Sequence, residues 1–144
     1  MSGCREIQVT IPATNRERQA AQAELAAELA KLPAEGFAEI WVDHDPVPRV
    51  CALVNGGVGW LMWMRYEGDA GCSSRNRAYL GPADATVAYM LSNGQVDNYP
   101  ASWAYPRAQV FAALESFARD QGMPGVSWFD DNTNQPYRPE AAKE

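Results

Sequence analysis

Histidine is almost absent from this sequence, in which His44 stands alone among 144 residues. A single imidazole excludes metal sites built from several histidines, and it weakens any nucleophile–histidine–acid triad. The flanking Asp43 and Asp45 would point to the opposite face in an extended segment, because side chains alternate along a strand. We therefore expect an exposed strand end here rather than a metal site, although a turn at Pro46 would let the three side chains converge.

The cysteines are few, and no two of them lie close together in the sequence. Cys4, Cys51 and Cys72 are an odd set without a Cys-x-x-Cys motif, which argues against a disulfide framework and for a reducing compartment. The start of the chain lacks the layout of a signal peptide, and no apolar run approaches the roughly 20 residues that span a bilayer. We expect a cytoplasmic protein without membrane contact, with Cys51 in the core.

Catalytic signatures are also missing. The sequence has neither His-x-Glu nor Pro-Cys-x-x-Cys, the two halves of a zinc deaminase. The segment Gly56–Gly59 has the glycines of a phosphate loop but lacks the Lys-Ser/Thr that follows them. Ser73 and Ser74 have no neighbouring base, and the consecutive pair Asp130-Asp131 is explained better by the end of an element. The sequence predicts a binding protein and not an enzyme, with no catalytic residue, metal or cofactor.

Basic residues are outnumbered, with 12 Lys and Arg against 18 Asp and Glu and a net charge of −6. No Lys or Arg occurs between Ala78 and Pro106, a stretch that contains Asp84 and Asp97. Nucleic-acid binding needs cations to neutralise phosphates, so we expect no direct contact with nucleic acid. The stretch is either a solvated acidic face or a surface that meets a basic partner.

The pattern of turns and apolar residues predicts an α+β fold, with an antiparallel sheet of about five to seven strands and two main helices packed against it. Asn55-Gly56-Gly57 is a strong hairpin signal. Val58–Tyr66 has apolar side chains on both faces, which is typical of a central strand covered on each side. The other expected strands are Glu6–Ile11, Phe37–Val42, Arg49–Val54, Ala85–Leu91, Gln95–Tyr99 and Val126–Phe129.

Two helices and two irregular segments complete this prediction. A capping box from Thr14 to Glu17 opens a helix that runs to about Leu32. The second helix, Pro106–Gln121, ends with Gly122 as its cap. Glu67–Arg77 is expected to be a long polar loop. We expect one domain over residues 1–131 and a flexible tail over residues 132–144.

Aromatic and acidic residues supply the candidate contact surface. Most of the five tryptophans are expected in the core, but Trp103 lies in the Pro100–Pro106 connection. Tyr and Trp are favoured as interface anchors, and loops at strand ends can present carboxylates on a rigid sheet. The candidate interface residues are Glu67, Asp69, Asp84, Asp97, Tyr99, Trp103 and Tyr105.

The order of features in residues 58–128 resembles immunity protein family one of bacterial polymorphic toxin systems. These features are an aromatic strand, a polar loop, a hairpin ending at Tyr99-Pro100, and a helix with the pattern Ala108-x-Val110-x-x-Ala113-Leu114-x-x-Phe117. The closing segment Gly122–Trp128, with Pro124 four residues before Trp128, is the most specific part. The resemblance covers about half of the chain and does not extend to its Ala-rich first helix or its polar tail.

The resemblance implies a small α+β protein of the bacterial cytoplasm that binds a cognate toxin domain and occludes its active site. Family members are often paired with nucleic-acid deaminase toxins, including cytosine deaminases, and an acidic inhibitor suits the basic groove of such a toxin. Two alternatives remain open from the residues themselves. One is a small-ligand-binding domain or small enzyme with a pocket beside the sheet, and the other is a non-catalytic adaptor subunit.

Overall fold

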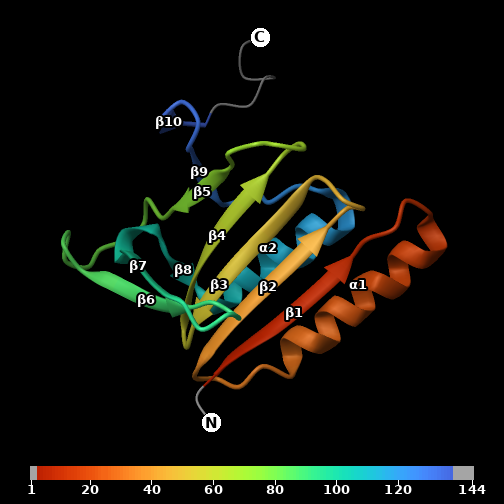
Figure 1. Cartoon of the computed structure of the whole chain (residues 1–144), viewed down its shortest axis with the longest axis horizontal. Helices are drawn as coiled ribbons and strands as arrows, with labels where there is room; N and C mark the ends of the chain where they lie inside the picture. The colour runs from red at the N-terminus through yellow and green to blue at the C-terminus, as the bar shows by residue number, and fades with distance from the viewer. Residues whose placement is uncertain (1–2, 138–144) are drawn as a thin grey trace.

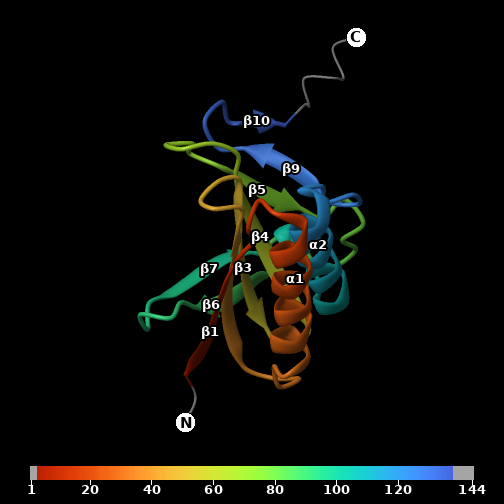
Figure 2. The ribbon, with the colours of Figure 1, turned by 90° about the vertical axis from the view of Figure 1, so that its right-hand side faces the viewer.

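A twisted sheet with both helices on one face forms the frame of the protein (Figures 1 and 2). The computed structural model describes residues 3–137. The strands of the main sheet lie in the order β1-β2-β3-β4-β5-β9-β10, each hydrogen-bonded to the next. A short β8 pairs with β4. Their bounds are β1 Cys4–Thr10, β2 Phe37–Asp43, β3 Arg49–Asn55, β4 Val58–Met64, β5 Cys72–Arg75, β8 Tyr105–Pro106, β9 Ser127–Asp130 and β10 Gln135–Pro136.

The remaining elements are the two α-helices of this frame, a 3-10 turn and a separate two-stranded sheet. The helices are α1, Asn15–Ala30, and α2, Arg107–Asp120, and a 3-10 turn, η1, spans Ala101–Trp103. The small sheet is the hairpin of β6, Thr86–Met90, and β7, Val96–Pro100. The predicted α+β class is confirmed. The sheet has more strands than predicted, and the hairpin stands outside it. One pairing is parallel, between β1 and β2, because α1 connects them as a crossover.

The main core lies between the helices and the sheet. Apolar side chains at alternate positions of β1 to β4 point to this side, as the period of a strand requires. α1 contributes Leu25 and Leu29, and α2 contributes Leu114 and Phe117, all nearly inaccessible to solvent. α2 packs closely on β4 at Gly59, where a Cβ atom would lie 3.1 Å from Val110 Cγ2. No helix in residues 3–137 combines the length and the apolar character needed to cross a membrane.

The predicted β3–β4 hairpin and two-sided strand are confirmed. Asn55 pairs with Val58 across the turn at Gly56-Gly57, and Gly56 has the positive φ of 57° that favours glycine. Along β4, Leu61 belongs to the helix-side core, whereas Trp60 belongs to a second cluster on the other face. β4 is therefore covered on both sides.

Several local predictions were wrong. The expected loop Glu67–Arg77 contains β5, which pairs with both β4 and β9. The hydroxyl of Thr14 bonds the Glu17 carboxylate at 3.2 Å instead of a backbone amide. Gln121 and not Gly122 takes the left-handed conformation at the end of α2, with φ 66°, and its N–H donates to Phe117 O.

The boundary of the predicted tail was also wrong. Asp130 accepts hydrogen bonds from the N–H groups of Asn132 and Thr133, and the turn leads into β10, which pairs with β9. The ring of Tyr137 then packs edge-on against Trp63, with centroids 5.3 Å apart. Residues 132–137 are thus part of the fold. The rest of the predicted tail, 138–144, lies outside the described residues.

This arrangement predicts different stabilities for two truncated chains. A chain ending at residue 131 loses β10 and the Tyr137 ring, and we expect it to be roughly 1–3 kcal/mol less stable than a chain ending at residue 137. Urea denaturation followed by tryptophan fluorescence measures the difference. Equal free energies of unfolding would contradict the assignment of residues 132–137 to the fold.

Candidate protein-binding face and pockets

The face of the sheet that points away from the helices is only partly covered. Figure 2 shows the β6–β7 hairpin and the β4–β5 turn projecting from this side, opposite α1 and α2. Strand register and alternation place a set of half-buried side chains between these two projections. We call this set the open face; it consists of Trp41, Arg49, Met62, Met64, Arg75 and Phe129.

A continuous stack of side chains holds the hairpin on this side of the sheet. The Tyr99 ring of β7 lies between Trp60, with centroids 4.6 Å apart, and Trp103, with centroids 5.9 Å apart. The Arg75 guanidinium then lies 3.6 Å from the Trp103 centroid and 4.5 Å from that of Phe129. We call these five side chains the aromatic ladder. Burial of Tyr99, followed by the effect of Asp97, raises its pKa to about 12, so the phenol stays neutral at physiological pH.

Two polar anchors fix the hairpin further. At one point Asn55 Nδ2 donates to Ala88 O of β6 at 2.8 Å. At the other, the Glu39 carboxylate of β2 accepts a hydrogen bond of 2.9 Å from the N–H of Ser92, which lies in the hairpin turn. The second oxygen of Glu39 accepts a hydrogen bond of 2.7 Å from Trp41 Nε1–H. The hairpin is therefore tied to β2, β3 and β4.

A small groove remains between the hairpin and the sheet. It has a volume of about 160 Å³. We call it the hairpin groove; its walls include Glu39, Trp41, Trp60, Met62, Asp97 and Tyr99. It combines aromatic walls with two carboxylates and has no Lys or Arg in its lining.

The structure brings together some of the predicted interface residues. Asp97 and Tyr99 are neighbours on β7, where the Tyr99 hydroxyl donates to Asp97 at 3.1 Å, and Trp103 continues the same stack. Asp84 and Glu67 are exposed but belong to separate connections, before β6 and after β4. Whether these residues contact a partner stays a prediction.

Tyr105 does not lie on the surface, so its place among the contact candidates was wrong. It is 4% exposed; its hydroxyl donates to Arg75 O at 2.7 Å and accepts the Ser127 N–H at 2.9 Å. The sequence indicated only that Pro100–Pro106 connects two elements. The connection turns inward through η1 and pairs with β4 as β8, which buries the Tyr105 ring.

Asp69 is held inside its own loop. Its carboxylate receives the Arg65 guanidinium at 2.7 and 2.8 Å, and also the backbone N–H groups of Arg65 and Gly71. The Asp69 side chain is fully covered. These donors, above all the Arg65 side chain, lower the pKa of Asp69 to about 2. The carboxylate shapes the β4–β5 turn and is not free for a partner, unlike that of Glu67.

His44 lies against α2. Its Nε2 is 2.8 Å from Phe117 O, and its ring meets that of Phe117 edge-on. Burial is the main cause that lowers the pKa of His44. Within residues 3–137, no three His, Cys, Asp or Glu side chains are grouped so that they could hold a metal ion.

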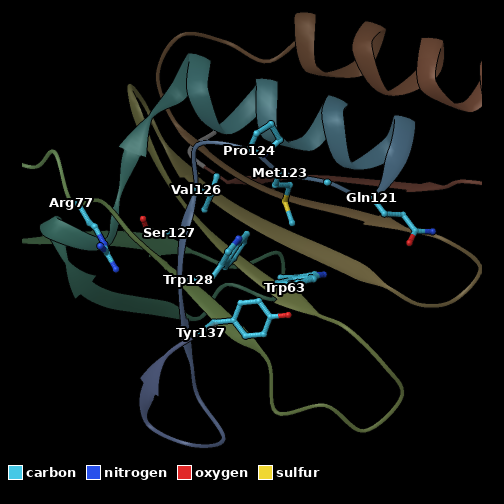
Figure 3. A pocket seen from close by; sticks show the side chains of 10 residues that line it. Trp63, Arg77, Gln121, Met123, Pro124, Val126, Ser127, Trp128 and Tyr137 are labelled. Atoms are coloured by element: carbon cyan, nitrogen blue, oxygen red, sulfur yellow. The ribbon is translucent and has the colours of Figure 1, made fainter. Parts of the chain in front are cut away.

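A larger pocket of about 620 Å³ lies on the helix side, where α2 ends over β4 and β9. Figure 3 shows the rings of Trp63, Trp128 and Tyr137 gathered along it, with Arg77 and Gln121 farther apart. The segment Gly122–Trp128, which carries the most specific part of the family resemblance, contributes most of one wall. Sequence reasoning missed this pocket because Tyr137 was assigned to the tail and Arg77 to a loop.

Comparison with known proteins found no matching protein family and no similar curated protein.

The Arg65–Asp69 pair predicts a pH-dependent stability. An unfolded carboxyl titrates near 3.8, above the folded value of about 2, so the stabilisation is complete at neutral pH and is lost as pH falls from about 4 towards 2. We expect Asp69→Asn to lower the free energy of unfolding by roughly 1.5–3 kcal/mol at pH 7 and by much less near pH 2.

The control is Glu67→Gln, which changes an exposed carboxylate of the same turn and should leave stability within about 0.5 kcal/mol of wild type. Urea titrations at both pH values make the comparison. If the two variants were equally stable at pH 7, the pair would not be holding the loop.

Proposed function

We propose that this protein is an immunity protein of the bacterial cytoplasm that binds and neutralises a cognate toxin domain, a nucleic-acid deaminase, by occluding its active site. The observation that carries the proposal is the open face. Aromatic residues, Met and Arg are enriched in protein interfaces, and here they sit on a sheet backed by a packed core. The open face suits a partner protein.

The charge of the β6–β7 hairpin, and not that of the open face with its Arg49 and Arg75, supports a basic partner. The β6–β7 hairpin, which borders the open face, lies within the stretch from Ala78 to Pro106 that contains no Lys or Arg. A toxin that grips nucleic acid needs a basic groove. Complementary charge would steer such a toxin towards the hairpin. The hairpin and the β4–β5 turn would then cover the toxin's basic groove.

The small-ligand alternative has one observation in its favour. The pocket beside α2 has the volume of a ligand site, about 300–1,000 Å³ in general, and an aromatic lining. Thermal stabilisation by a compound in a metabolite screen would support that function. An adaptor subunit is distinguished by its gene neighbourhood, because an immunity gene should adjoin a toxin gene.

Co-expression with the toxic domain encoded by the adjacent gene tests the proposal. We expect the wild-type chain to restore growth and to co-purify as a one-to-one complex. Met64→Lys, which replaces an apolar side chain of the open face and adds a positive charge directly across from Arg49, should weaken the complex at least about tenfold, since added like charge opposes the docking of a basic partner. Ala23→Lys, on the exposed side of α1, makes the same charge change away from the face and should bind normally.

Continued killing without a complex would refute the immunity function for that pair. If the complex formed and Met64→Lys bound as tightly as wild type, the open face would not be the binding surface.

A further inference from the structure

We propose that the hairpin groove is a receptor for a single basic side chain, Lys or Arg, presented by the partner protein. The proposal rests on the proposed function, since it assigns a chemistry to one part of the toxin-binding face. Three observations carry it: two carboxylates without a cationic partner, an aromatic wall, and the size of the groove.

The carboxylates of the groove form no ion pair within residues 3–137. Glu39 is 8% exposed, and both of its oxygens accept hydrogen bonds from neutral donors, the Ser92 amide and the Trp41 indole. Asp97 likewise accepts from neutral groups, Gln95 Nε2 at 2.8 Å and the Tyr99 hydroxyl. Neither takes part in any of the ion pairs found in residues 3–137. Glu39 is buried and Asp97 is half-buried, and a cation in the groove would supply the ion pair that both lack.

The walls of the groove are suited to the same kind of guest. Trp41, Trp60 and Tyr99 line it. The Tyr99 ring is stacked between Trp60 and Trp103, so a guest would meet the indole rings of Trp41 and Trp60, and the faces of such rings attract ammonium and guanidinium groups. The protein already uses this interaction on the same side of the sheet, where Arg75 covers Trp103 at 3.6 Å and Arg49 covers Trp41 at 4.5 Å. Arg49 lies within 4.0 Å of neither groove carboxylate, so it does not neutralise them by direct contact.

The size of the groove selects a side chain over a free ligand. Its volume of about 160 Å³ is below the roughly 300–1,000 Å³ of small-molecule sites, and it suits one extended Lys or Arg side chain. The groove also borders Met62 of the open face, so a partner docked there could insert a side chain without moving the hairpin. The stem would pack on the aromatic and Met side chains while the charged end meets the carboxylates.

Small probes test the groove directly. N-acetyl-lysine amide and N-acetyl-arginine amide are titrated into the 15N-labelled protein, with N-acetyl-norleucine amide as the neutral analogue, and the indole N–H signals are followed by NMR. We expect the basic probes to shift the Trp41 signal with millimolar affinity, while norleucine does not. Asp97→Asn should weaken binding about tenfold, whereas Asp84→Asn, an exposed carboxylate outside the groove, should have no effect. Asp97 is the better test residue because Glu39 also anchors the hairpin.

Equal shifts with norleucine and lysine, or no shift of Trp41 up to 50 mM probe (a concentration of about ten times the expected dissociation constant), would overturn the proposal. The toxin complex separates the two proposals. If Asp97→Asn binds the toxin as wild type does while Met64→Lys fails, the groove assignment is wrong and the immunity function stands. If no toxin complex forms but lysine amide still shifts Trp41 in an Asp97-dependent manner, the groove assignment stands and the immunity function fails.

Discussion

The insertion of Tyr99 between Trp60 and Trp103 is the contact on which the candidate binding face depends. Each aromatic pair of this kind contributes about 0.5–1.5 kcal/mol beyond the area it buries. The pair with Trp60 attaches β7 to β4 of the main sheet, and the pair with Trp103 extends the stack to Arg75 of β5. Without this attachment the second face of β3 and β4 would be bare apolar surface. With it, the hairpin covers Cys51 and Leu53 and leaves the hairpin groove and open face beside it.

The two faces of the sheet therefore differ in how completely they are covered. The helix side is a packed core in which Leu61, Leu114 and Phe117 are inaccessible to solvent, with a pocket only where α2 ends. The opposite side is closed only under the hairpin, and elsewhere it presents half-buried Met, Trp and Arg side chains. A rigid core on one side gives these side chains fixed positions, which lowers the cost of ordering them on binding.

Local signals made the hairpins and helices predictable. Asn55-Gly56-Gly57 indicated the β3–β4 turn, and the apolar residues of Val58–Tyr66 indicated a strand covered on both sides. β5 was missed because Cys72–Arg75 lacks the branched and aromatic residues that favour strands. It forms because β4 and β9 pair on either side of it, and Leu61 N–H donates to Ser74 Oγ. Such partners lie far away in the sequence.

The candidate site was predictable only in part. Asp97, Tyr99 and Trp103 are close in sequence and lie together in the structure. The residues around Glu39 in the sequence did not indicate that it belongs to the candidate site. It reaches the groove through the pairing of β2 with β3 and the docking of the hairpin over both. Tyr105 shows the reverse case, in which a residue between two prolines looked exposed and is buried by β8 pairing.

The central claim is that the partner covers the open face and its hairpin. Amide hydrogen–deuterium exchange of the chain, alone and bound to the proposed toxin partner, tests it most directly. The account predicts slower exchange in β6, β7 and the β4–β5 turn on binding, with no change along the exposed side of α1. Protection confined to α1 and α2, with the hairpin unchanged, would contradict it.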